Sequence, residues 1–169
     1  MKANIPTITV SGAHSGAGKT AVVERLLQEL KGWSCLKVTL LHNGPCPTGR
    51  DCGACDKMSS RFSIISNKKT IEVQNKDTWR FKKAGAKKVL WLRAKPRGLK
   101  QGLKKAISMF SAEGGFVSGE KDARGLIIEG TSVLKYLQPD LAILVKRRDS
   151  ILKDSAQEVL KKIDLILTM

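Results

Sequence analysis

Short apolar runs alternate along the chain with segments in which apolar residues recur every three or four positions. The apolar runs predict buried strands over residues 7–10, 35–41, 89–92, 125–129, 140–145 and 164–167. The second pattern predicts helices over residues 19–31, 77–86, 98–110 and 155–162. Gly32 and Gly85 stand where glycine commonly ends a helix. This alternation predicts an α/β fold in three layers, a mainly parallel sheet with helices on both faces.

A glycine-rich segment joins the first predicted strand to the first predicted helix. Its sequence is Ala13-His14-Ser15-Gly16-Ala17-Gly18-Lys19-Thr20, a phosphate-binding loop with alanine in place of the usual first glycine. In this motif the glycines let backbone N–H groups surround phosphate oxygens, the lysine reaches the β and γ phosphates, and the hydroxyl binds Mg²⁺. The segment therefore predicts a P-loop NTPase domain in which residues 13–20 bind GTP or ATP.

Two acidic residues are candidates for the metal side of such a site. Glu129 ends an apolar run, and ligands of open α/β sheets bind beyond the carboxyl ends of the strands. We expect Glu129 to hold Mg²⁺ through water. Asp77 has two interpretations, as the N-cap of its helix or as a carboxylate facing the metal. With Lys19, which neutralises phosphate charge in the transition state, Asp77 and Glu129 form the predicted catalytic set.

The charge of the chain indicates an anionic partner. Its 169 residues, 41% of them hydrophobic, suit one domain over residues 1–169, and 31 Lys and Arg against 15 Asp and Glu give a formal charge of +16. Among the basic residues, Arg93, Lys95 and Arg97 follow an apolar strand, where an anionic ligand would bind. Only 5% of residues are aromatic, which makes nucleic acid an unlikely partner. Since no stretch approaches about 20 apolar residues, we expect no membrane partner and a cytoplasmic protein.

A loop at residues 42–57 carries a second group of chemically active side chains. It contains His42, Cys46, Cys52 and Cys55 in the spacing H-x3-C-x5-C-x2-C. Four nitrogen and sulfur donors can complete a tetrahedral Zn²⁺ site, and three thiolates can instead hold an iron–sulfur cluster shared between subunits. Free thiols or a redox disulfide are the alternatives. Cys35, inside a predicted strand, is interpreted as a small buried apolar residue.

Three segments resemble one known family. Residues 12–20, the stretch from Lys76 to Ala86 and the run from Leu126 to Gly130 are similar to the MobB-type P-loop GTP-binding adaptors of molybdopterin-guanine dinucleotide biosynthesis, and the similarity extends over nearly the whole chain. The resemblance implies that Lys19 and Thr20 bind phosphate and Mg²⁺ and that Asp77 and Glu129 lie near the metal. It also implies a homodimer that assists attachment of a nucleotide to molybdopterin together with a nucleotidyltransferase partner. The cysteine segment departs from the family pattern.

These observations predict a protein that binds GTP or ATP with Mg²⁺ and hydrolyses it slowly in molybdenum cofactor biosynthesis. Two alternatives remain open at the level of sequence. The first is a nucleotide-dependent metallochaperone or a GTPase of metal-site maturation, which the cysteine loop would suit. The second is a basic nucleic-acid-binding module, which would use the positive charge without nucleotide turnover.

Overall fold

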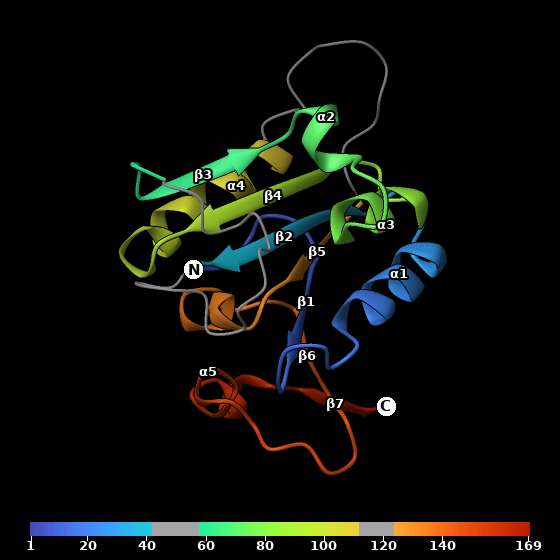
Figure 1. Ribbon diagram of the computed structural model, residues 1–169, viewed down its shortest axis with the longest axis vertical. Helices are drawn as coiled ribbons and strands as arrows, with labels where there is room; N and C mark the ends of the chain where they lie inside the picture. Colours follow the sequence, from blue (N-terminus) through green and yellow to red (C-terminus); the bar gives the residue numbers. More distant parts are fainter. Residues whose placement is uncertain (42–57, 112–123) are drawn as a thin grey trace.

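A computed structural model describes residues 1–41, 58–111 and 124–169 of the chain. Its centre is a seven-stranded sheet in the order β3-β4-β2-β5-β1-β6-β7 (Figure 1). The strands are β1 (Thr7–Gly12), β2 (Ser34–Leu40), β3 (Phe62–Ile65), β4 (Val89–Ala94), β5 (Leu126–Glu129), β6 (Leu141–Lys146) and β7 (Leu165–Thr168). The described strands pair in parallel, except that β3 runs antiparallel to β4. The predicted α/β fold with a mainly parallel sheet is confirmed.

Helices cover both faces of this sheet. On one face α1 (Lys19–Glu29) lies beside α3 (Asp77–Lys83), and their residues Leu27 and Phe81 pack in one apolar cluster with Cys35 (Figure 1). On the other face α4 (Leu99–Ser111) contributes Leu103 to a second cluster with Leu36. Neighbouring residues of β2 thus belong to opposite clusters, as the alternation of side chains along a strand requires. The shorter elements are α2 (Lys68–Ile71), α5 (Asp154–Gln157) and the 3₁₀ segments η1 (Pro96–Gly98), η3 (Thr131–Lys135) and η4 (Leu160–Lys162).

The structure differs from the sequence prediction in four places. The edge strand β3 and the short helices α2 and η3 carry too few residues to produce a period, and they were not expected. The helix expected over residues 155–162 is divided into α5 and η4. Here Ala156 and Val159, three residues apart, are the buried residues, and a spacing of three suits 3₁₀ turns.

The capping interpretation of Asp77 is wrong, although the end of its helix is as expected. Lys76 is the N-cap of α3, and Asp77 is the first helical residue. The Asp77 carboxylate accepts a hydrogen bond from the Thr20 hydroxyl instead of capping the helix. Gly85 follows the C-cap Ala84 with a φ of 103°, in the left-handed region that ends helices. Asp77 is therefore free to take part in a site.

Strand register brings the candidate residues to one edge of the sheet. Glu129, the last residue of β5, pairs with Val10 of β1 on one side and with Lys37 of β2 on the other. Because neighbouring residues of a parallel pair point to the same face, Lys37 and Glu129 both project toward the side that α1 and α3 cover. The loop that follows β1 starts three residues beyond Val10, so the loop and Glu129 lie close together.

Candidate functional site

The loop between β1 and α1 has the backbone of an anion-binding turn. Gly16 and Gly18 have φ angles of 75° and 98°, which L residues rarely adopt. Gly18 immediately precedes α1, whose first N–H groups have no partner within the helix. None of the N–H groups of residues 14–18 donates to an acceptor in the described part of the chain. The loop thus presents a run of unpaired donors beside a helix N-terminus, where negative charge is stabilised.

Neighbouring segments hold this loop in place. The Gly12 N–H donates to Oγ1 of Thr131 at 3.1 Å, and the Ala13 N–H donates to the carbonyl of Val145 at 2.9 Å. The Lys153 N–H in turn donates to the carbonyl of Ala13 at 2.9 Å. Sequence reasoning did not find Thr131 or Lys153, because their contacts join segments more than 110 positions apart. These bonds fix the loop before any ligand binds.

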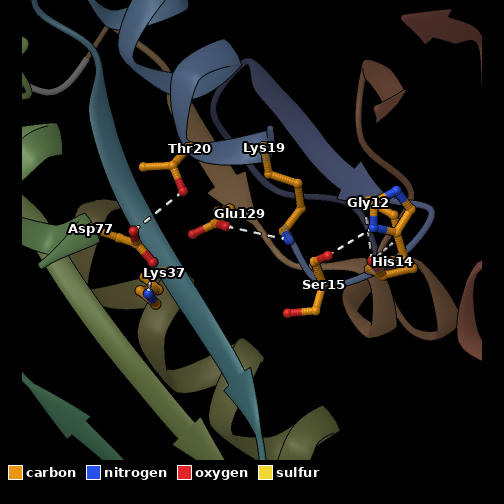
Figure 2. Close-up of polar contacts among 9 residues, drawn as sticks. Gly12, His14, Ser15, Lys19, Thr20, Lys37, Asp77 and Glu129 are labelled. Carbon is orange, nitrogen blue, oxygen red and sulfur yellow. Dashed lines mark hydrogen bonds and ion pairs between the residues drawn. The ribbon is translucent and has the colours of Figure 1, made fainter. Parts of the chain in front are cut away.

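Lys19 folds back over the end of β1. A Cβ at position 12 would lie 2.9 Å from Cδ of Lys19, so the glycine at this position leaves room for the lysine side chain. The Lys19 Nζ lies 3.8 Å from Oε1 of Glu129 (Figure 2). The Lys19 side chain thus extends from the start of α1 past Gly12 toward the Glu129 carboxylate.

Glu129 is a buried carboxylate that is only partly satisfied. It is 5% exposed, and its Oε2 has no hydrogen-bond partner among the described residues. Burial raises the pKa of Glu129 above its ordinary value, although Lys37 and Lys19 partly offset this effect. A buried acceptor without a donor costs free energy unless water or a cation reaches it. This oxygen is therefore a suitable ligand for a metal or for metal-bound water.

Asp77 connects α3 to the loop and to β2. The Thr20 hydroxyl donates to Oδ1 of Asp77 at 3.3 Å, and Nζ of Lys37 forms an ion pair with Oδ2 (Figure 2). Burial alone would raise the pKa of Asp77, but the charge of Lys37 and the hydrogen bonds from Lys37 and Thr20 together lower it. The sequence contains one signal for Lys37, because it is a charged residue inside the apolar run CLKVTLL.

An ion pair between helices sets the position of Asp77. The Arg80 guanidinium in α3 contacts the Glu24 carboxylate in α1, with Nε donating to Oε1 at 2.8 Å. Two parallel N–H donors of arginine to one carboxylate restrict orientation as well as distance. Asp77 lies one turn before Arg80 in α3, so this ion pair holds Asp77 against the start of α1.

The oxygen atoms that could bind a metal at this edge of the sheet suit a hard divalent cation. Mg²⁺ is commonly held by one or two carboxylates and a hydroxyl, and phosphate and water complete its coordination. Thr20, Asp77 and the unpartnered oxygen of Glu129 supply that set. Within the described ranges no group of three or more His, Cys, Asp or Glu side chains could hold a metal alone. His42, Cys46, Cys52 and Cys55 lie outside the described residues.

Comparison with known proteins supports the fold. Among solved structures, the chain is similar to the "apo" form of LpxK from Aquifex aeolicus in complex with ATP, with a TM-score of 0.56 and 18% sequence identity. The similarity covers 100% of this chain and 49% of LpxK, so this chain spans about half the length of that protein. No protein-family model and no curated protein matches the chain. No helix in the described ranges is long and apolar enough to cross a membrane.

The three basic residues expected beside the ligand are not one group. Arg93 lies inside β4 rather than after it, with its guanidinium 5.6 Å from the centre of the Trp91 ring. Arg97 instead lines a groove of about 710 Å³ along α4, together with Lys100 and Lys104. Since α4 covers the opposite face of the sheet from Trp91, Arg93 and Arg97 lie on different faces, and the expectation that they bind an anion stays a prediction.

Two further loop residues point in different directions. Nδ1 of His14 lies 2.7 Å from the carbonyl of Ser15, while Nε2 of His14 is buried without a hydrogen-bond partner among the described residues. Ser15 is exposed at the top of the loop. His14 is thus partly buried, whereas Ser15 is open to solvent.

The two carboxylates are expected to have opposite effects on stability. Glu129 has a raised pKa in the folded chain, so its ionisation opposes folding at neutral pH. This penalty disappears as the pH falls below the ordinary pKa of a glutamate, about 4. Asp77 has a lowered pKa, so its ionised form stabilises the fold at neutral pH and loses that effect as the pH falls through the folded value. Glu129→Gln is therefore expected to raise the melting temperature at pH 7, and Asp77→Asn to lower it.

Thermal unfolding followed by circular dichroism between pH 2 and pH 8 measures both effects. The difference between Glu129→Gln and wild type is expected to shrink as the pH falls toward the ordinary glutamate pKa, whereas the difference between Asp77→Asn and wild type is expected to shrink only below the ordinary aspartate pKa. A Glu129→Gln protein less stable than wild type at pH 7 would contradict the assignment of an uncompensated buried charge.

Proposed function

We propose that this protein binds Mg²⁺ together with GTP or ATP and hydrolyses the nucleotide slowly. The observation that carries the proposal is the convergence at one sheet edge of the unpaired loop N–H groups, the Lys19 ammonium and the oxygen donors Thr20, Asp77 and Glu129. A similar fold with ATP bound, in LpxK, supports it.

Each residue has a role that follows from its position. The N–H groups of residues 14–18 surround the phosphates, and Lys19 neutralises charge on the β and γ phosphates. Thr20, Asp77 and Glu129 would hold Mg²⁺, and Glu129 would also orient a water molecule in the site. When bound, Mg²⁺ supplies positive charge that stabilises the phosphoryl oxygens. Intrinsic hydrolysis at such sites is slow where no additional cation reaches the γ phosphate.

Calorimetric titration with GTP and with ATP tests this proposal, each in the presence of Mg²⁺ and in the presence of EDTA. We expect saturable binding of one nucleotide per chain that is weaker without Mg²⁺. Phosphate release is then measured for wild type and for Glu129→Gln, which is expected to bind nucleotide while its turnover falls by about tenfold or more. A folded protein that binds neither nucleotide would refute the proposal, and equal turnover in the two proteins would remove Glu129 from the mechanism.

The more specific proposal is that nucleotide handling here serves molybdopterin-guanine dinucleotide biosynthesis, in a cytoplasmic homodimer. It is supported by the resemblance of residues 76–86 and 126–130 to the adaptor family, since these stretches contribute Asp77 and Glu129 to the site. Light scattering after size exclusion measures the oligomeric state, and mass spectrometry of copurified small molecules tests for a pterin. A monomer that carries no pterin and does not bind a molybdopterin nucleotidyltransferase would argue against this role.

A further inference from the structure

Lys37 lies beside one of the two carboxylates that the proposed function assigns to a divalent cation. Its Nζ contacts Oδ2 of Asp77, and its backbone is in register with Glu129 on the neighbouring strand (Figure 2). We propose that Lys37 is an internal counterion that competes with Mg²⁺ for Asp77 and Glu129, so that the cation binds well only when nucleotide is present. This inference rests on the proposed nucleotide-binding function.

The geometry restricts where the Lys37 ammonium can lie. The residue belongs to β2, and its side chain is 20% exposed, so the backbone anchor is rigid and most of the stem is enclosed. It projects to the same face as Glu129. The other oxygen of Asp77 receives the Thr20 hydroxyl, which leaves Oδ2 for a cation. An ammonium group and a metal ion would therefore compete for the same carboxylate oxygen.

Charge balance explains the coupling to nucleotide. Asp77 and Glu129 carry two negative charges when ionised, and Lys37 and Lys19 carry two positive charges beside them. A divalent cation that arrives alone thus meets a nearly neutral site and must displace an ammonium group. A nucleoside triphosphate adds several negative charges and attracts Lys19 to its phosphates, which leaves the carboxylates underneutralised. The site then favours binding of the divalent cation.

A purely structural ion pair makes a different prediction. If Lys37 served only to hold β2 to α3, its removal would lower stability and leave the affinity for divalent cations unchanged. If it is the competing counterion, its removal leaves two carboxylates without that neighbour and raises cation affinity in the nucleotide-free protein. The sign of the change in cation affinity distinguishes the two roles, independently of any effect on folding.

The experiment uses Mn²⁺ as the probe, because carboxylate, hydroxyl and water ligands suit Mn²⁺ as they suit Mg²⁺. Electron paramagnetic resonance measures free Mn²⁺ in titrations of the nucleotide-free protein. Lys37→Met is expected to bind Mn²⁺ about tenfold or more tightly than wild type. Lys37→Gln, which keeps a polar group that can donate to Asp77, is expected to do the same and provides a second test if the methionine variant does not fold. Lys37→Arg, which keeps the charge, is expected to bind Mn²⁺ as weakly as wild type.

Lys135→Met is the matched control. Lys135 pairs with Glu158 in an exposed ion pair on η3, so its replacement removes the same charge at a position outside the site. It is expected to leave Mn²⁺ affinity unchanged. Affinities of Lys37→Met and Lys37→Gln equal to those of wild type and Lys135→Met would overturn the inference.

Wild-type protein provides a further measurement. Its Mn²⁺ affinity is expected to rise about tenfold or more when a non-hydrolysable GTP or ATP analogue is present. Equal Mn²⁺ affinity with and without a nucleotide that calorimetry shows to be bound would also overturn the inference. Failure of the nucleotide to bind at all would instead refute the proposed function, so the two failures are distinguishable.

Discussion

Replacing Lys19 by alanine is expected to reduce the affinity for GTP and ATP by about a hundredfold or more, because the loop loses its charge-assisted contact with the β and γ phosphates. The backbone donors of residues 14–18 remain in place, since they depend on Gly16, Gly18 and the bonds from Gly12 and Ala13. They cannot compensate for the loss of a full positive charge. Calorimetric titration with each nucleotide in Mg²⁺ measures the effect.

The Lys19→Ala chain is expected to remain folded. The Lys19 contact with Glu129 is long, at 3.8 Å, and Lys37 still lies beside that carboxylate when Lys19 is removed. Lys31→Ala is the matched control, because Lys31 is exposed just after α1 and its replacement removes the same charge. Circular dichroism establishes that both variants are folded. If Lys19→Ala bound nucleotide as tightly as Lys31→Ala, the phosphate-binding role of the loop would have to be abandoned.

Periodicity was sufficient to predict most of the fold because the buried elements are long and their apolar residues face one layer. Residues 98–110 show this, since the apolar positions Leu99, Leu103 and Phe110 are all buried in α4 as expected. Periodicity failed for β3, whose four residues are each half-buried at the edge of the sheet. Its position depends on pairing with β4, which is a long-range interaction that no local pattern records.

The candidate site was predictable where chemistry follows local sequence and not where it depends on register. The loop over residues 13–20 and the end of β5 at Glu129 follow from motif and strand order. The partnership of Lys37 with Asp77 joins positions 40 residues apart, and it requires the packing of α3 against β2. Whether Asp77 caps its helix or faces the loop was undecided for the same reason, because both roles place it at the same helix end.

The cysteines separate into two kinds by their surroundings. Cys35 is fully buried in the apolar cluster under α1, and burial raises the pKa of its thiol well above the ordinary value. The thiolate form that binds a metal is therefore disfavoured at Cys35, and its burial in the apolar cluster confirms its interpretation as a small apolar residue. Cys46, Cys52 and Cys55 lie among Pro, Gly and polar residues in the sequence, outside the described residues.

Replacing Cys52 and Cys55 together by serine is expected to remove all metal from the protein, since the C-x2-C pair supplies two thiolates to one ion. Wild type purified without oxygen is expected to carry about one Zn²⁺ per chain, or iron with acid-labile sulfide, measured by elemental analysis and sulfide assay.

Cys35→Ala is the matched control and is expected to keep the metal, because its thiol is neutral and buried. The double variant is expected to bind nucleotide like wild type, because the phosphate site is built from other segments. Metal-free wild type would assign the three cysteines to free thiols or a disulfide, and metal retained by the double variant would show that other residues bind it.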